Sequence, residues 1–260
     1  MIVFEELNPV KVAVAGDWHA NAHYARKAVR HAAGQGAEAI LHVGDFAYDM
    51  RENFDGSPDF LDHVQDALEE TGLVLGWVDG NHDNHTLLAE LVRDHGHTAI
   101  PIRPNIYYLP RGYRWIWNGV RFLAMGGAHS VDRPWRRPHI EWWPGETITT
   151  ADALRACEGG PADIMICHDV PAGVRIPCIE GNPYGFPHAQ ISAAELNRRV
   201  LRGVVDVVQP KRLFAGHYHC RLTAELVAGN YRTRVDILDA DHAPVDANTT
   251  LLDLGGYSRL

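Results

Sequence analysis

Polar side chains of metal-binding type directly follow five short apolar runs of the sequence. Each run ends in Asp, Asn or His, and the set contains carboxylate, amide and imidazole groups but no thiolate, which suits Mn²⁺, Fe or Zn²⁺. Seven such groups exceed the needs of one open catalytic ion, so they predict two ions about 3.5–4 Å apart that share one carboxylate. In chain order the candidate ligands are Asp17, His19, Asp45, Asn81, His168, His217 and His219.

Each of these blocks has an ordinary explanation when it is taken alone. A Gly-Asp pair after a strand usually marks a turn, Gly80-Asn81-His82 could begin a helix, and His168 could be a buried core histidine. The interpretation changes because all five blocks occur together, each at the end of an apolar run. Glycines precede most of them, and a residue without Cβ lets the backbone turn sharply beside a bound ion.

The apolar runs are rich in Val, Ile and Leu and lack clean alternation, which is typical of strands buried on both faces. In an open α/β sheet, ligands bind beyond the carboxyl ends of the strands. The pattern therefore predicts that the candidate ligands meet at one edge of a sheet. The expected strands cover residues 10–15, 39–43, 73–78, 163–167 and 212–215.

Capping signals predict the helices between these strands. One helix is expected over residues 20–33 with Gly34 after its end, and another opens with Ser57 as N-cap and Pro58 as first residue and ends at Gly72. Two more are expected from Asn84 to Gly96, and from a capping box at Ser192 to about residue 201.

Antiparallel strands are expected outside this core. Asn118-Gly119 between two apolar stretches predicts a two-residue hairpin turn, and three more strands are expected at 221–227, 231–238 and 249–254. No internal repeat or low-complexity linker divides the chain. We therefore expect an α/β core with antiparallel additions, and residues 1–260 as a single domain.

Composition limits the class of protein. The 260 residues carry a formal net charge of −9, with 46% hydrophobic and 22% charged residues, as in ordinary globular proteins. No apolar run approaches the ~20 residues that span a bilayer, and residues 1–6 do not resemble a signal peptide, so the expected compartment is the cytoplasm. The acidic balance argues against stable binding of duplex nucleic acid and disfavours a nuclease.

The order of the five blocks resembles the calcineurin-like metallophosphoesterases. The blocks span residues 17–219 and none is missing. The resemblance implies a four-layer αββα sandwich of two packed mixed sheets flanked by helices, with the metal site at the carboxyl ends of the strands. It also implies the ligand sets: Asp17, His19, Asp45 and His219 for the first ion, and Asp45, Asn81, His168 and His217 for the second.

The implied reaction is hydrolysis of a phosphoester by in-line attack of a metal-bound hydroxide, with Mn²⁺ the metal most expected to support activity. Asn81 and His82 would contact the substrate, and His82 is the candidate general acid or phosphate-binding group. Asp83 is a candidate to orient His82, although stabilisation of a helix N-terminus explains its position equally well.

The pattern is most similar to the cyclic-nucleotide phosphodiesterase branch of the family, including its small bacterial and phage members. Residues 128–132, followed by Trp142-Trp143-Pro144, carry this part of the resemblance. It implies cleavage of 2′,3′- or 3′,5′-cyclic nucleotides. Trp18, Trp142, Trp143 and Phe186 are candidates to stack on a base, and core packing is an equally good interpretation of the tryptophans.

Three other functions stay open: a phosphomonoesterase or phosphoprotein phosphatase, a nuclease and a non-catalytic scaffold. A phosphomonoesterase of this family would carry extra arginines near the phosphate, and the sequence does not place Arg133, Arg136 or Arg137 there. His129 and His188 are equally unplaced.

The cysteines form no CxxC pair and are expected to be reduced. Cys167 and Cys220 neighbour candidate ligands, and strand alternation favours packing roles for both.

Overall fold

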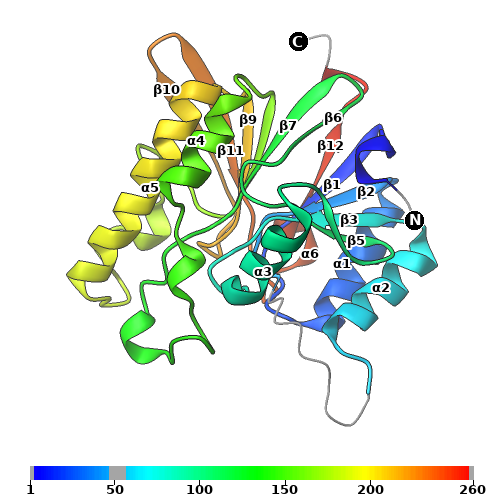
Figure 1. The fold of residues 1–260 in the computed structure, drawn as a ribbon, viewed down its shortest axis with the longest axis horizontal. Helices are drawn as coiled ribbons and strands as arrows, with labels where there is room; N and C mark the ends of the chain where they lie inside the picture. Colours follow the sequence, from blue (N-terminus) through cyan, green and yellow to red (C-terminus); the bar gives the residue numbers. More distant parts are fainter. Residues whose placement is uncertain (1–2, 47–56, 258–260) are drawn as a thin grey trace.

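A computed structural model describes residues 3–46 and 57–257 and shows four layers. Two six-stranded sheets pack face to face, and helices cover the outer face of each. Helices α1 (Ala22–Gly34) and α2 (Phe60–Thr71) lie on one side, and α4 (Thr150–Glu158) and α5 (His188–Val208) lie on the other (Figure 1). The predicted αββα architecture is confirmed.

The first sheet has the strand order β12-β1-β2-β3-β5-β4. Its four inner strands are parallel, and an antiparallel strand closes each edge. The parallel order brings the carboxyl ends of β1, β2 and β3 side by side. The strands are β1 (Lys11–Ala15), β2 (Ala39–His42), β3 (Val74–Trp77), β4 (Ile100–Arg103), β5 (Ile106–Tyr108) and β12 (Thr249–Asp253).

The second sheet repeats this plan in the order β10-β11-β9-β8-β7-β6. Four parallel strands lie inside and one antiparallel strand lies at each edge. Asn118 and Gly119 both have positive φ and join β6 to β7, which confirms the predicted hairpin. The strands are β6 (Arg114–Trp117), β7 (Val120–Met125), β8 (Ile164–Cys167), β9 (Arg212–Ala215), β10 (Leu222–Ala228) and β11 (Tyr231–Ile237).

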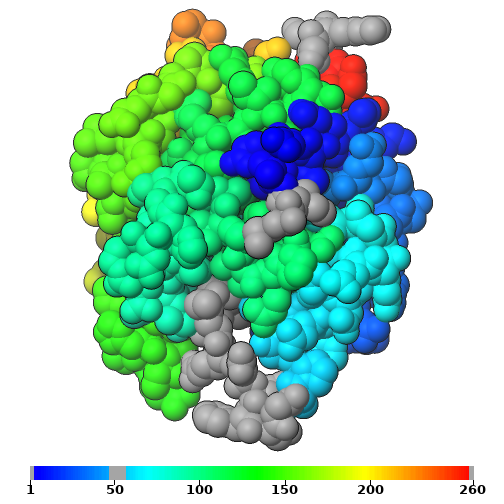
Figure 2. All heavy atoms as spheres, turned by 45° about the vertical axis from the view of Figure 1, so that its right-hand side comes forward, coloured from blue at the N-terminus to red at the C-terminus, as the bar shows by residue number. Residues whose placement is uncertain are grey.

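An aromatic core holds the two sheets together. Phe4, Trp115, Trp117 and Phe122 are all buried between them, and the Phe4 ring lies 4.9 Å from that of Trp117. Figure 2 shows the N-terminal residues, in dark blue, against the green residues of this region. The expectation about residues 1–6 rests in part on residues 1 and 2, which lie outside the described residues.

Local capping chemistry corrects two predicted helix boundaries. Asp59, not Ser57, is the N-cap of α2, because its carboxylate accepts a hydrogen bond from Asp62 N while the Asp62 side chain accepts one from Asp59 N. Helix α1 runs through Gly34, and the residue with positive φ beyond its end is Gly36. The caps at Asn84, before α3 (His85–His95), and at Gly72 are confirmed.

The prediction for α5 is wrong at its start. The helix begins at His188, directly after Pro187, so Ser192 lies inside it rather than at its cap. Leu201, Val204, Val205 and other apolar residues of its later turns pack on the second sheet, which extends the helix to Val208.

No helix in the described ranges has the length and apolar character needed to span a bilayer. The sequence analysis also missed several elements. The missed elements are β4, β5, α4, the short helix α6 (Val245–Asn248), and the 3₁₀ turns at Phe4–Glu6, Arg133–Trp135, Pro144–Glu146 and Pro177–Ile179.

Candidate metal centre

The seven candidate ligands lie at the carboxyl ends of five parallel strands, where the two sheets meet. Those from the first sheet follow β1, β2 and β3, and those from the second follow β8 and β9. The first sheet supplies Asp17, His19, Asp45 and Asn81, and the second supplies His168, His217 and His219.

The structure brings six of the seven into two groups with metal-ligand spacing. Within each group, one donor atom from every residue lies within 4.8 Å of the others. The first group is Asp17, His19, Asp45 and His219, and the second is Asp45, His168 and His217. Asn81 adjoins the second group, because its Oδ1 lies 3.1 Å from His168 Nε2.

Asp45 belongs to both groups, and each of its carboxylate oxygens faces one of them. Oδ2 lies 3.5 Å from His19 Nε2, and Oδ1 lies 3.4 Å from His168 Nε2. One carboxylate shared between two ligand sets is the arrangement that a pair of neighbouring cations requires.

An unsatisfied carboxylate oxygen indicates that the centre suits cations. Asp17 Oδ1 is buried and has no hydrogen-bond partner among the described residues, and such a group is costly unless something compensates it. Its Oδ2 lies 3.4 Å from His219 Nε2. A divalent ion would satisfy the open oxygen, so the donor set fits the dinuclear centre, without fixing which metal it holds.

The backbone of the centre adopts conformations that ordinary residues avoid. Four candidate ligands have positive φ: His19 (45°), Asp45 (51°), His217 (68°) and His219 (48°). Such conformations cost of order 1 kcal/mol or more each, persist only where the surroundings enforce them, and cluster at functional sites.

Glycines allow the ligands to lie this close together. A Cβ on Gly44, whose φ is +104°, would lie 2.6 Å from His168 Nδ1. A Cβ on Gly80 would collide with Asp45, and one on Gly216 would collide with Asp17. The glycines identified in the sequence therefore make room for the donor atoms.

In the absence of metal, protons would occupy part of this centre. Burial alone would lower the pKa of His168, but the Asp45 and Asp17 carboxylates raise it to about 10. Burial would likewise lower the pKa of His19, but the neighbouring carboxylates, mainly Asp45, raise it to about 9. Burial and the neighbouring His168 lower the pKa of His217, which favours the neutral, metal-binding imidazole.

Each sheet orients ligands that belong to the other. The His168 ring, from the second sheet, hydrogen-bonds through Nδ1 to Val43 O of the first sheet, 2.9 Å away, which turns Nε2 toward the centre. His19 Nδ1, from the first sheet, contacts Asp241 Oδ1, 3.0 Å away, in the loop after β11.

The Asn81 amide is oriented in the same way. Its Nδ2 donates to Ser130 Oγ, 3.0 Å away, in the loop after β7, and Ser130 Oγ donates to the buried Glu146 carboxylate. This chain leaves Asn81 Oδ1 facing the second ligand group. Sequence reasoning did not identify Asp241, Ser130 or Glu146 as supports, because no motif links them to their ligands.

His82 lies at the edge of the centre, next to an arginine. Its backbone N–H donates to Asp45 Oδ1, 2.9 Å away, and its Nδ1 lies 3.4 Å from Arg136 Nη1. Burial, and then Arg136 among the neighbouring charges, lower the pKa of His82 despite the attraction of Asp45. The Asp83 carboxylate accepts a hydrogen bond from Gly80 N, 2.7 Å away. That contact supports the loop that carries Asn81 and His82, and the orientation of His82 by Asp83 stays a prediction.

A cleft of about 490 Å³ opens beside the ligands. Asp45, Asn81 and His82 lie in its wall together with Arg136 and the loop that contains Tyr184 and Phe186. The Phe186 ring lies 5.8 Å from Tyr184 and 5.7 Å from Trp135, and Trp135 and Tyr184 are both exposed. The arginine and the aromatic cluster are features that the sequence analysis did not place.

Of the four aromatic residues that the sequence analysis named as candidates for base stacking, only Phe186 lines the cleft. Trp18 and Trp143 are buried, and Trp142 packs under the Arg133 guanidinium, 4.5 Å from its ring centre. Three tryptophans that were candidates for base stacking are therefore packing residues.

The remaining histidine and arginine candidates are not members of the two ligand groups. His129 is buried against Gln190, and His188 is the exposed first residue of α5. Arg137 pairs with Glu141, and Arg133 with the buried Glu146.

All four cysteines are free. Cys167 is buried in β8, as expected. Cys220 Sγ lies 3.0 Å from Cys178 Sγ rather than in the ligand cluster.

Comparison with known families decides the class of protein. The family described as calcineurin-like phosphoesterase matches residues 10–221, which contain every candidate ligand. The chain belongs to the calcineurin-like phosphoesterase family.

Two curated relatives of this phosphoesterase chain are lariat debranching enzymes of fruit flies. The Drosophila pseudoobscura pseudoobscura protein is 30% identical over 164 residues, 57% of this chain and 29% of that protein. The Drosophila melanogaster protein is 30% identical over 175 residues, 61% of this chain and 31% of that protein. The chain thus spans less than a third of the length of these relatives.

Solved structures share the fold at low sequence identity. A dimetal phosphatase from Danio rerio has a TM-score of 0.57 and 13% identity, covering 94% of this chain and 92% of its own. A protein of Thermus thermophilus has a TM-score of 0.56 and 15% identity, covering 96% of each chain. These likenesses show the phosphoesterase fold alone.

Proposed function

We propose that this chain hydrolyses phosphodiester bonds of nucleotides at a dinuclear metal centre, with cyclic nucleotides as the first substrates to test. The observation that carries the proposal is the Asp45 carboxylate shared by two ligand groups at the wall of an open cleft. Two bound cations would supply a water of lowered pKa and would neutralise the charge on the phosphoryl group. Mn²⁺ is our choice for the first assays.

The residues around the ligands would orient the substrate. Asn81 and His82 lie in the cleft wall. In the proposed complex the His82 imidazole would lie next to the phosphoryl group and protonate the leaving oxygen. Burial and Arg136 lower the pKa of His82, so a phosphate anion beside it would have to restore the proton. Arg136 itself would bind a non-bridging phosphate oxygen.

The aromatic cluster supports a nucleotide as the bound group. Trp135 and Tyr184 are 63% and 66% exposed, although large apolar side chains are usually buried in a core. Base–aromatic stacking contributes about 1–3 kcal/mol per base. Tyr184→Ala should therefore raise KM for a cyclic nucleotide by about 10-fold at unchanged kcat, whereas Ile116→Ala, at a similarly exposed site on β6, should change neither.

The decisive assay compares bis-4-nitrophenyl phosphate with 4-nitrophenyl phosphate, in Mn²⁺ and after chelation. Faster metal-dependent cleavage of the diester supports the proposal and is followed by 2′,3′- and 3′,5′-cyclic nucleotides. Faster cleavage of the monoester would replace it with a phosphatase, a function that Arg136 at the cleft would suit. No cleavage of either ester in Mn²⁺, together with no metal bound to the purified protein, would indicate a scaffold.

A second candidate is a phosphodiesterase that acts on a nucleic-acid strand. Both curated relatives bear the name lariat debranching enzyme, which favours this candidate. The net charge of −9 opposes it unless basic residues gather locally.

A further inference from the structure

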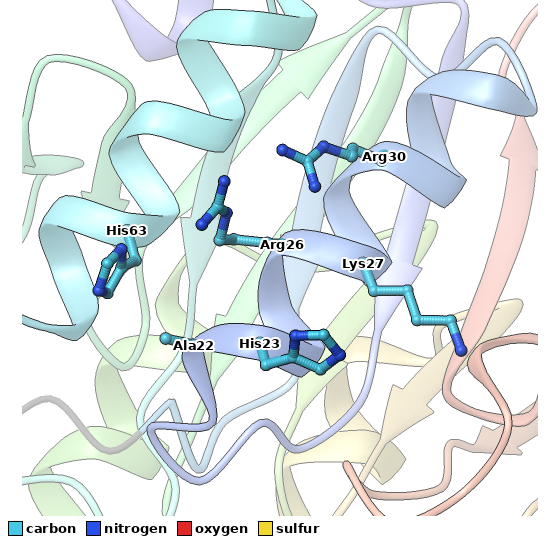
Figure 3. A pocket seen from close by; sticks show the side chains of 6 residues that line it. All are labelled: Ala22, His23, Arg26, Lys27, Arg30 and His63. Atoms are coloured by element: carbon cyan, nitrogen blue, oxygen red, sulfur yellow. The ribbon is translucent and has the colours of Figure 1, made fainter.

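A second pocket, made almost entirely of basic and histidine side chains, lies between α1 and α2. It has a volume of about 530 Å³, and no carboxylate of residues 3–46 or 57–257 is among the side chains that line it. Figure 3 shows Arg26 and Arg30 extending from α1 toward α2, where His63 closes the far side. We call it the α1 pocket; its lining residues are Ala22, His23, Arg26, Lys27, Arg30 and His63.

The cations of the α1 pocket are only partly compensated within the described residues, where Glu70 of α2 interacts electrostatically with Arg30 and Arg26. Helix α1 contains no Asp or Glu, in a chain whose net charge is −9. Arg26 Nε is buried and has no hydrogen-bond partner among the described residues. Arg30 pairs with Glu70 at 2.7 Å, but both side chains are about half exposed, and such pairs contribute little and exchange readily.

The three cations of α1 are close together in sequence. Arg26, Lys27 and Arg30 lie within five residues of one helix, and like charges this close repel one another. A bound anion would relieve that repulsion.

The α1 pocket begins next to the candidate metal centre. Ala22 follows the candidate ligand His19 by three residues, and a tight turn with a 2.8 Å hydrogen bond from Asn21 N to Trp18 O joins them. From Ala22 to Arg30 the helix rises about 12 Å, at 1.5 Å per residue. That length gives room for more than one backbone phosphate of a strand.

We infer that the α1 pocket binds the backbone phosphates of a single-stranded nucleic acid whose scissile phosphodiester lies at the metal centre. The inference rests on the proposed function and deepens it, because it changes the preferred substrate from a mononucleotide to a strand. It also explains how an acidic protein could hold a polyanion, because Arg26, Lys27 and Arg30 form a local group of positive charges beside the centre.

The test compares Arg26→Gln/Lys27→Gln/Arg30→Gln with the intact protein, both loaded with Mn²⁺. The probe is a short fluorescein-labelled RNA strand with phosphorothioate linkages, which slow hydrolysis, and the readout is anisotropy against salt concentration. The triple variant should bind at least 10-fold more weakly, and the slope of log K against log salt should fall in magnitude by about 2, at ~0.7 per lost phosphate contact. Hydrolysis of bis-4-nitrophenyl phosphate should be unchanged.

A matched control removes three basic residues from other faces. Arg93→Gln/Arg121→Gln/Arg232→Gln has the same change in net charge, because it also removes three positive charges. Each of its three side chains is a surface member of an ion pair, as Arg30 is. This control should lose far less affinity. Equal loss in the two triple variants would overturn the inference, because a non-specific effect of charge would then account for the binding.

Two further outcomes separate this inference from the proposed function. Lys27→Glu, at an exposed position that does not endanger folding, should by itself weaken strand binding and flatten the salt slope. Unchanged strand binding in both this variant and the triple variant, or equal competition by inorganic phosphate and by strand, would overturn the α1 pocket as a strand site. Absence of bis-4-nitrophenyl phosphate hydrolysis in the intact protein would instead overturn the proposed function.

Discussion

The two sheets have the same plan but contribute different chemistry to the centre. Both have four parallel inner strands and two antiparallel edges. The first sheet supplies the oxygen donors Asp17, Asp45 and Asn81, whereas the second supplies only imidazoles. The contacts of His168 with Val43 O and of His19 with Asp241 show that each sheet orients ligands of the other. The centre therefore depends on the junction of the sheets and belongs to neither alone.

The largest expected effect is loss of the shared carboxylate. Asp45→Asn should lose both ions and lower turnover of bis-4-nitrophenyl phosphate by about 1,000-fold, because several kcal/mol of charge stabilisation disappear. His168→Gln, in the second sheet, should lose only the ion of the second group. Metal content and turnover measure both, with the exposed Asp253→Asn as control. Two ions retained at full turnover in Asp45→Asn would refute the shared-ligand arrangement.

The next largest effect on turnover is expected from loss of the His82 imidazole, which lies in the cleft wall beside the ligands. His82→Ala should retain both ions and lose about 100-fold in turnover of a diester with a poor leaving group, because proton donation contributes about 10²–10⁴-fold. The loss should be much smaller for 4-nitrophenolate, which leaves without a proton. The exposed His95→Ala is the control. Equal losses on both substrates would exclude proton donation and leave a role in binding.

Smaller effects are expected where one sheet orients a ligand of the other. Asp241→Ala should weaken metal binding at the first group by about 10-fold, and Ser130→Ala should do so at the second, in line with the usual effect of removing a ligand's hydrogen-bond partner. Titration with Mn²⁺, followed by calorimetry, distinguishes the two sites. Unchanged affinities would mean that the ligands hold their positions without help from the opposite sheet.

The smallest effect concerns protons and the stability of the metal-free protein. Without metal, His19 and His168 have pKa values of about 9 and about 10, against 6.5 when unfolded. Their protonation stabilises the fold fully below pH 6.5, and this stabilisation is lost as the pH rises to between 9 and 10. Tm in chelator should fall by about 4 °C or more across this window.

With Mn²⁺ bound, the same two imidazoles would be neutral ligands throughout, so the Tm of the metal-loaded protein should not follow this decline. Binding of Mn²⁺ at pH 7 should release protons, because the ligands must lose theirs. A pH-independent affinity for Mn²⁺ would contradict the assignment of His19 and His168 as ligands.

The sequence predicts the parallel strands and the convergence of their ends well, for a physical reason. Runs such as residues 39–43 are buried on both faces, so their composition alone identifies them, and the ligands follow them directly. The structure brings together all seven candidates that this reasoning named. Their role as metal ligands stays a prediction that the experiments above test.

What the sequence did not predict depends on contacts between distant residues. Asp241 reaches His19 across more than two hundred residues, and Arg136 reaches His82 across fifty-four. Neither has a fixed spacing from its partner. The sequence analysis placed the starts of α2 and α5 at Ser57 and Ser192 because serine is a common N-cap residue. In the structure the N-cap of α2 is Asp59, and that of α5 is Pro187.

The left-handed backbone at Asp45, His19, His217 and His219 has a consequence for how the chain could diverge. Glycine adopts this conformation at lower cost than aspartate or histidine. In a related protein that had lost catalysis, replacement of these residues by glycine would therefore relieve the backbone cost. We expect candidate ligands to be lost first at these four positions. In this chain the Asp and His side chains at these four positions carry a backbone cost that two bound cations would offset.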